Sequence, residues 1–237
     1  MARSVHASTV DVLTPVGVAR LHVSAVGRAR ALVVLGHGAG RGVDSDDLRG
    51  LAADLPEHGV SVVLVDQPWV LAGRRIAVAP ATLDIAWVPA VRAAREASGA
   101  SRRTPLVVGG RSAGARVACR TSADTGPEAL LLLAVPLVPP AARRDADRYA
   151  TALAVRGAEL RGPLDAGVPV VVAQGERDAF GSARELRAAL GRPTAVAAEV
   201  VAVVGADHAL RAARGGADPG PVLLMAALRA VALARGE

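Results

Sequence analysis

The sequence predicts an α/β protein built on a mostly parallel β-sheet with helices on both faces. Short runs that are almost entirely apolar alternate along the chain with segments of helical periodicity. Strands of that kind are buried on both faces, as happens when crossover helices cover both sides of a parallel sheet. The 237 residues show no change of composition and no internal repeat, so we expect a single domain over residues 1–237.

Each expected strand is a short apolar run bounded by glycine, proline or polar residues. Residues 10–13 and 16–23 flank Thr14-Pro15 and alternate as the two arms of an antiparallel hairpin do. The other runs are nearly all apolar and are expected to form the parallel part of the sheet. They are 31–35, 60–65, 105–108, 129–135, 168–173 and 196–204.

Segments with helical spacing of apolar residues lie between these strands. They are 44–58, 82–98, the segment that follows residue 112, 148–160, 182–190 and 221–235. Asp44 or Ser45 is the expected N-cap of the first, and Pro89 predicts a kink in the second or a later start. Residues 71–80 are expected to be an irregular loop, and the connection 136–166 is too short for a large cap domain.

The composition excludes several kinds of partner. All 28 basic residues are arginine and are scattered among 22 acidic residues, so the net charge of +6 forms no basic stripe that would bind nucleic acid. The N-terminus lacks a signal-peptide pattern, and no apolar stretch reaches the ~18 residues of a membrane helix. We therefore expect a cytoplasmic protein that binds neither nucleic acid nor a membrane.

No metal or cofactor is expected. The five histidines lie far apart, and none has the i, i+4 spacing of a helical metal site. The glycine-rich segment 36–40 does not match a phosphate-binding loop, which requires a lysine that this chain lacks. The single cysteine, Cys119, excludes an intramolecular disulfide and is expected to be a core residue rather than a second nucleophile.

The segment 105–118 carries the clearest chemical signal. A buried strand leads into Gly110-x-Ser112-x-Gly114, and a helix follows. This is the G-x-S-x-G pattern of a strained strand-to-helix turn that presents a serine hydroxyl, and such a turn needs very small residues on both sides of the serine. The free N–H groups of the helix N-terminus lie where an oxyanion would form. A tight turn without a catalytic role is the less favoured alternative.

A serine hydroxyl becomes a nucleophile when a histidine accepts its proton and a carboxylate orients that histidine. His208 is the only histidine after Ser112, and it follows the last expected strand. Asp178, which comes soon after strand 168–173, is the favoured acid, with Glu176 and Asp207 as alternatives. Because the carboxyl ends of parallel strands meet at one edge of a sheet, we expect these side chains to converge there.

Two backbone N–H groups are expected to stabilise an oxyanion, that of Ala113 beside the serine and that of Ala39 in the loop 37–40. Further residues near the expected pocket are candidate substrate contacts, with packing or loop roles as the alternative. They are His37, Gly38, Gln67, Trp69 and Arg111. For His37, bracing of its own loop is the favoured role.

These segments together resemble a known family. The matching pieces, in chain order, are 36–40 (GHGAG), 66–69 (DQPW), 72–75 (AGRR), 109–114 (GGRSAG), 174–181 (QGERDAFG) and 207–208 (DH). They resemble the compact α/β-hydrolases related to dienelactone hydrolase, in particular a bacterial group similar to the hydrolase-like subunit of a histone-acetyltransferase complex. The resemblance implies the α/β-hydrolase fold and a triad of Ser112, Asp178 and His208. Dienelactone hydrolases proper carry a cysteine where this chain has Ser112, and relatives tend to carry a histidine where it has Val138.

The sequence thus predicts a serine hydrolase that cleaves a small ester or thioester through an acyl-enzyme. One alternative is a catalytically silent hydrolase-fold scaffold that binds a partner, which the similarity to a complex subunit suggests. Another is an acyltransferase, in which an acceptor other than water resolves the same acyl-enzyme.

Overall fold

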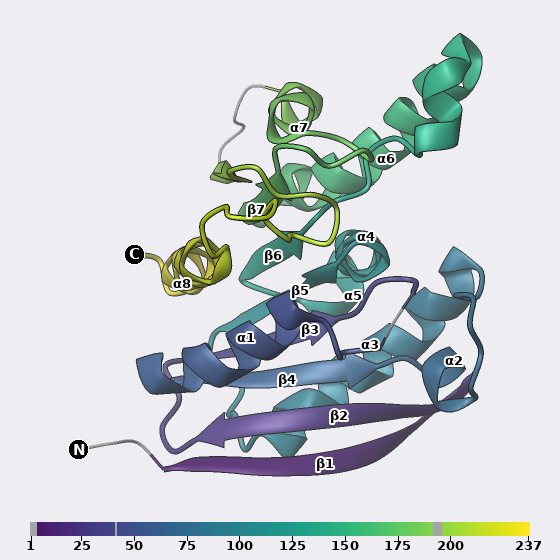
Figure 1. Cartoon of the computed structure of the whole chain (residues 1–237). Coiled ribbons are helices and arrows are strands. Elements are labelled where there is room, and N and C mark those ends of the chain that lie inside the picture. The colour runs from purple at the N-terminus through teal and green to yellow at the C-terminus, as the bar shows by residue number, and fades with distance from the viewer. Residues whose placement is uncertain (1–3, 41, 192–195) are drawn as a thin grey trace.

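The computed structural model describes residues 4–40, 42–191 and 196–237, and its strands form one sheet (Figure 1). The strands are β1 (Val5–Thr14), β2 (Gly17–Val26), β3 (Ala31–Gly36), β4 (Val60–Asp66), β5 (Leu106–Arg111), β6 (Ala129–Leu133), β7 (Val170–Gly175) and β8 (Ala198–Val203). Their order across the sheet is β1-β2-β4-β3-β5-β6-β7-β8. β1 pairs with β2, and β2 with β4, in antiparallel fashion, whereas the pairings from β4 to β8 are parallel.

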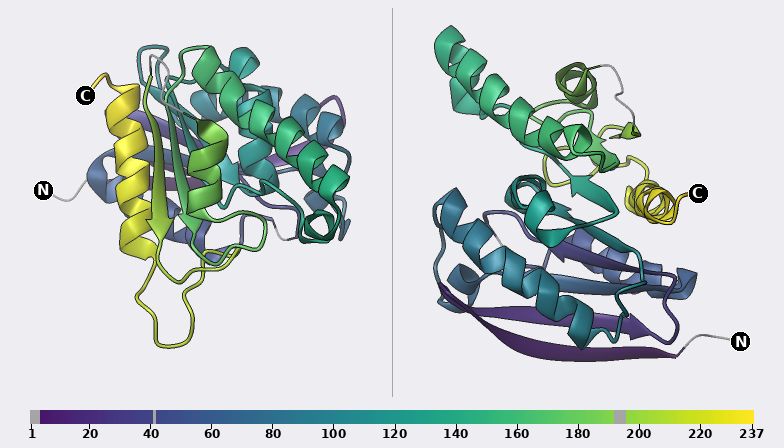
Figure 2. Two further views of the ribbon diagram at one scale, coloured as in Figure 1. Left: turned by 90° about the horizontal axis from the view of Figure 1, so that it is seen from above. Right: turned by 180° about the vertical axis from the view of Figure 1, so that it is seen from behind.

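Helices cover both faces of this sheet (Figure 2). They are α1 (Asp46–Asp54), α2 (Pro68–Leu71), α3 (Pro80–Ala97), α4 (Ala113–Arg120), α5 (Ser122–Thr125), α6 (Ala146–Asp165), α7 (Ala183–Leu190) and α8 (Gly220–Ala234), with 3-10 turns η1 (Leu55–His58) and η2 (Pro140–Arg144). α1 and α8 pack on one face, and α3, α4, α6 and α7 pack on the other. The predicted fold class is confirmed, and only η2 and α6 lie between β6 and β7, so no cap domain is inserted there.

Two helices differ from their predicted bounds at prolines. The segment 44–58 is not one helix, because α1 ends at Asp54 and η1 follows with Pro56 in its first turn. A proline lacks the N–H that an α-helix needs at that point. α3 begins at Pro80, earlier than expected, since proline fits the first position of a helix, and it continues through Pro89. Ser45 occupies the N-cap position of α1 without a side-chain hydrogen bond.

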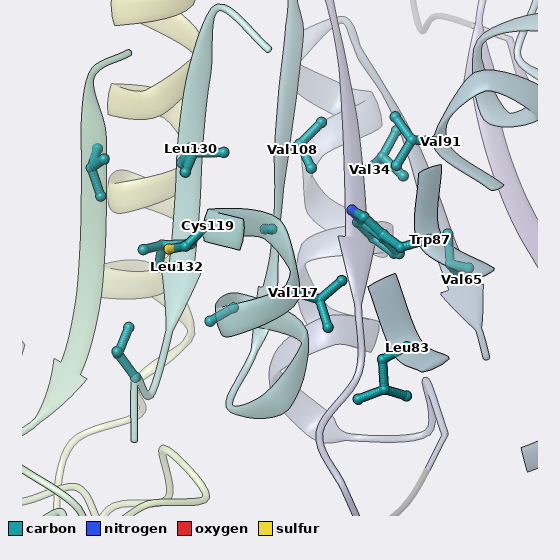
Figure 3. Close-up of a cluster of buried hydrophobic side chains, with 14 of the residues drawn as sticks. Val34, Val65, Leu83, Trp87, Val91, Val108, Val117, Cys119, Leu130 and Leu132 are labelled. Carbon is teal, nitrogen blue, oxygen red and sulfur yellow. The ribbon is translucent and has the colours of Figure 1, made fainter. Parts of the chain in front are cut away.

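The apolar side chains form a core on each face of the sheet. Figure 3 shows part of the larger one, in which Trp87 of α3 packs beside Val34 and Val65 of the sheet. Cys119 lies in the same core, and burial raises the pKa of its thiol to about 12. Such a thiol carries no thiolate at neutral pH, so it is unsuited to be a nucleophile.

Both cores end at the edge of the sheet where the parallel strands finish. The loops that follow β3, β5, β7 and β8 leave this edge, and they carry the residues expected to be functional. In the described ranges of the chain, no helix is long and apolar enough to cross a membrane.

Candidate active site

Ser112 lies on the sharp turn between β5 and α4. Its backbone has φ +53° and ψ −107°, in the left-handed half of conformational space that a non-glycine residue rarely adopts. Its N–H donates to Leu133 O at the end of β6 at 2.9 Å, which ties the turn to the neighbouring strand. A strained serine held by its surroundings is typical of a nucleophile on a strand-to-helix turn.

The glycines of the motif allow this turn to pack against the end of β3. A Cβ added at Gly110 would lie 2.5 Å from Gly36 O, and one added at Gly114 would lie 2.6 Å from the same oxygen. A side chain at either position would therefore push β5 and α4 away from β3. The structure thus explains why glycine is needed at both positions: a side chain there would clash with the backbone of β3.

The structure brings Ser112, His208 and Asp178 together from three separate loops. Ser112 Oγ is 3.0 Å from His208 Nε2, and His208 Nδ1 is 2.8 Å from Asp178 Oδ2. Because a carboxylate only accepts hydrogen bonds, Nδ1 carries the ring proton and Nε2 accepts from the serine hydroxyl. This is the arrangement in which a histidine can act as general base toward a serine.

Asp178 is the carboxylate that reaches the histidine, and the other two candidates are engaged elsewhere. Glu176 accepts a hydrogen bond from Gly205 N at 3.1 Å on the surface. Asp207 accepts from the N–H groups of Ala209 and Arg211 within its own loop. The side chain of Asp178 is completely buried, whereas His208 is 24% exposed, so a substrate can reach the histidine but not the acid.

Gln174, which the sequence reasoning missed, orients Asp178. Its Nε2 donates to Asp178 Oδ2 at 2.8 Å, and Phe180 N donates to Oδ1 at 2.8 Å. The Gln174 side chain also accepts from Val135 N at 2.7 Å, which fixes its amide. A glutamine near the end of an otherwise apolar, fully buried strand was the available signal, because a buried amide needs polar partners.

Close packing holds the loop that carries His208. A Cβ added at Gly175 would lie 2.5 Å from Ala206 O and 2.6 Å from Asp207 O, so only glycine lets this loop approach the end of β7. The Phe180 ring packs 4.3 Å from the His208 ring, centroid to centroid, with the planes tilted by 32°. The imidazole therefore packs against the Phe180 ring, and the loop that carries it is held against the end of β7.

Arg111, predicted as a candidate substrate contact, is held by protein groups. Its Nη2 donates to His208 O at 3.0 Å, and its Nε lies 3.1 Å from Asp47 Oδ2 in α1. The Asp47 side chain is only 2% exposed, so this ion pair is largely desolvated. Arg111 thus links the end of β5 to the histidine loop and to α1.

An Arg111→Met variant is expected to lower the free energy of unfolding by about 2–4 kcal/mol, because it leaves the buried Asp47 carboxylate without its partner. Urea unfolding of both proteins at pH 7 measures this difference. The matched control is Arg49→Met, whose ion pair with Asp44 is exposed, and it should change stability by less than about 0.5 kcal/mol. Unchanged stability with a raised KM would instead assign Arg111 to substrate binding.

His37 braces the loop that follows β3. Its Nδ1 donates to Gly38 O at 2.7 Å, and its Nε2 accepts from Gln67 N at 3.0 Å. Both ring nitrogens are therefore engaged by backbone, and burial lowers the pKa of this imidazole. Gly114 N donates to His37 O at 3.1 Å, which joins the loop to the serine turn.

Asp66, at the end of β4, holds the other end of the same loop and was assigned no role from the sequence. It accepts from Val43 N at 2.9 Å and from His22 Nε2 at 2.9 Å, and His37 Nε2 is 4.0 Å away. Burial raises the pKa of this carboxyl, but the hydrogen bonds from His22 and Val43 outweigh that effect and lower it. A carboxylate at this position therefore fixes the loop to the sheet.

The residues expected to stabilise an oxyanion lie around one small cavity beside Ser112. Ala39 and Ala113 both line this cavity, whose volume is about 10 Å³. Within the described residues, neither of their N–H groups donates to a protein acceptor. Gly38, Gln67 and Trp69 line it as well, and the Trp69 ring packs edge-on against His37 at 5.4 Å.

The fold and this site define an α/β hydrolase, the class of enzyme that carries a nucleophile on such a turn. More narrowly, the chain belongs to the family described as alpha/beta hydrolase domain, whose model matches residues 29–231. A search of curated proteins returned no significant match. Among the described residues no group of histidine, cysteine and acidic side chains could hold a metal ion.

Solved structures show the same fold at low sequence identity. Est1E from Butyrivibrio proteoclasticus has a TM-score of 0.70 at 12% identity, with 94% of this chain and 99% of that chain covered. A dienelactone hydrolase from Anabaena variabilis has a TM-score of 0.66 at 16% identity, covering 97% and 96% of the two chains. A serine hydrolase without a lid from Xanthomonas campestris has a TM-score of 0.66 at 15% identity, covering 94% of each. The match to the family model thus confirms the predicted membership of the α/β-hydrolase superfamily.

Proposed function

We propose that the protein cleaves a small ester or thioester through an acyl-enzyme formed on Ser112. The observation that carries this proposal is the continuous chain of hydrogen bonds from Ser112 Oγ through the His208 ring to Asp178. Structural neighbours named as a dienelactone hydrolase and as a brefeldin A esterase favour an ester over an amide as substrate.

In the first half-reaction, Ser112 Oγ attacks the carbonyl carbon while His208 Nε2 takes the hydroxyl proton. Asp178 stabilises the imidazolium that forms, and the N–H groups of Ala113 and Ala39 donate to the oxyanion. The tetrahedral intermediate then expels the alcohol or thiol, which receives the proton from His208, and the acyl group remains on Ser112.

In the second half-reaction, a water molecule gives its proton to His208 Nε2 and attacks the acyl carbon. The acid leaves and the proton returns to Ser112 Oγ. An acceptor alcohol or amine in place of water would make the same site an acyltransferase. No cap domain is inserted between β6 and β7, and the His208 side chain is 24% exposed, which leaves the site accessible to either acceptor.

Intact-mass labelling with a fluorophosphonate tests the proposal. We expect one adduct on the wild type, because the probe phosphonylates an activated serine, and no adduct on Ser112→Ala. Ser101→Ala, which removes an exposed serine remote from His208, is the matched control and should label fully. A folded wild-type protein that stays unlabelled would overturn catalysis at Ser112 and favour the scaffold alternative.

A further inference from the structure

We propose that Gln67 makes this site selective for 2-hydroxyacyl groups, such as that of a glycolate ester or thioester. The inference rests on the proposed function, since it assigns the acyl part of the substrate to the small cavity beside Ser112. Gln67 is thereby a specificity-determining residue, whose amide oxygen accepts a hydrogen bond from the hydroxyl next to the substrate carbonyl.

The cavity adjoins the position that the acyl group would occupy. Both Ala39 and Ala113 line it, and their N–H groups are the proposed donors to the oxyanion. In this proposal the carbonyl carbon of a bound substrate is bonded to the oxyanion and to Ser112 Oγ, and its acyl substituent occupies the cavity. The departing alcohol or thiol must reach solvent and therefore lies on the open side.

Gln67, which lines this cavity, carries a buried hydrogen-bond acceptor that no described protein group uses. The residue is 5% exposed, and its Oε1 is buried without a hydrogen-bond partner among the described residues. Its Nε2 donates to Leu83 O at 3.3 Å, so the amide cannot be turned over to exchange the two atoms. Buried acceptors are almost always satisfied in folded proteins, and the residue that carries this one lines the cavity beside Ser112.

The remaining walls of the cavity favour a neutral ligand group. The two nitrogens of His37 are already engaged, by Gly38 O and Gln67 N. Trp87 turns the benzo edge of its ring toward Gly36, and its indole nitrogen is a neutral donor that is buried without a hydrogen-bond partner among the described residues. Among the described residues, no arginine, aspartate or glutamate lines the cavity, so these walls would compensate neither an anion nor a cation.

The size of the cavity limits the ligand group to little more than one heavy atom. A volume of about 10 Å³ corresponds to one water-sized probe. A methyl group would fill that space but would leave Gln67 Oε1 unpaired, whereas a hydroxyl would fill it and donate to that oxygen. A site that hydrogen-bonds a substrate hydroxyl rejects the analogue that lacks it.

The test compares glycolate and propionate esters of one alcohol, which differ in having a hydroxyl or a methyl group at the same position. For each ester, kcat/KM is divided by its second-order rate constant for hydrolysis by hydroxide, which removes the difference in intrinsic reactivity. We expect the wild type to prefer the glycolate ester by about 10- to 100-fold on this corrected scale, as befits one buried hydrogen bond. In Gln67→Met, which keeps the length of the side chain but lacks the acceptor, the corrected ratio should fall to about 1.

Two controls separate this inference from folding and from the proposed function. Arg74→Met alters the neighbouring cavity of about 130 Å³, which Gln67 also lines, and should retain the wild-type ratio. Arg74→Met should also react with the fluorophosphonate at Ser112 as fast as the wild type, and the far-UV circular dichroism and urea unfolding of Gln67→Met should match those of the wild type, which shows that it is folded.

Equal corrected rates for the two esters on the wild-type protein overturn the inference while leaving the proposed function intact. Labelling of Ser112 without turnover of either ester also overturns it, because the site then accepts no acyl group of this size. Absence of both labelling and turnover overturns the proposed function and this inference together.

Discussion

A His208→Gln variant is expected to lose about 10⁵- to 10⁶-fold in kcat while keeping its fold, since removal of the general base disables such a triad as a whole. Glutamine can still hydrogen-bond Ser112 Oγ, but its amide does not accept the hydroxyl proton. His208 is part of no apolar core, and its ring contacts are with Asp178, Ser112 and Phe180, so stability should change little. The measurement is kcat for an activated ester, with urea unfolding on the same preparations.

The matched control is His58→Gln, which removes an exposed histidine from η1, just before β4 begins and thus at the opposite edge of the sheet. It should retain kcat within about twofold, since it touches none of the reacting groups. A loss of less than tenfold in His208→Gln would contradict the proposed role and leave the Ser112 hydroxyl without a base in the described part of the chain.

The sheet and the nucleophile turn could be predicted because their signals are local in sequence. The strand 31–35 is entirely apolar, and this pattern predicts a strand buried on both faces. Gly110 and Gly114 are required by a contact with β3, but the two glycines and the serine between them lie within five consecutive residues, so the motif can be recognised from the sequence. His208 could be identified because it is the only histidine downstream of Ser112.

The supporting contacts could not be predicted because each depends on residues distant in sequence. From the sequence, Arg111 is a candidate substrate contact, but in the structure its guanidinium pairs with Asp47 in α1 and donates to the carbonyl of residue 208. Asp66 and Gln174 each follow an apolar run, and only the folded chain shows that Asp66 fixes the loop after β3 and that Gln174 fixes Asp178. Polar residues at the ends of buried strands indicate where such contacts occur, but the sequence does not identify the residue that each one contacts.

The carboxylate that contacts His208 could not be identified with certainty from the sequence for the same reason. Glu176 and Asp178 lie two residues apart in one loop, and no local pattern separates them. The turn after β7 directs Asp178 inward to Gln174 and His208, whereas Glu176 stays on the surface against the backbone of residue 205. Burial decides between two carboxylates of similar chemistry, and burial is a property of the fold.

Replacing Asp178 by asparagine is expected to lower kcat by about 10⁴-fold with little change in KM. Three donors point at the Asp178 carboxylate: Gln174 Nε2 and His208 Nδ1 at Oδ2, and Phe180 N at Oδ1. An asparagine has one oxygen, so in either orientation its NH₂ group faces a donor. When the oxygen stays toward Phe180 N, the NH₂ group faces Gln174 Nε2 and His208 Nδ1. The conflict with His208 is relieved when the ring proton moves to Nε2, and that tautomer cannot accept the proton of Ser112.

Steady-state kinetics and the imidazole N–H resonances in the proton NMR spectrum test this account together. We expect the Nδ1–H resonance of the wild type to vanish in Asp178→Asn, alongside the loss in kcat. Glu176→Gln is the matched control, because it makes the same chemical change two residues away, and it should retain kcat within about threefold. A loss in Glu176→Gln as large as that in Asp178→Asn would contradict the assignment, since among the described residues the Glu176 side chain hydrogen-bonds to the surface backbone at residue 205 and not to His208.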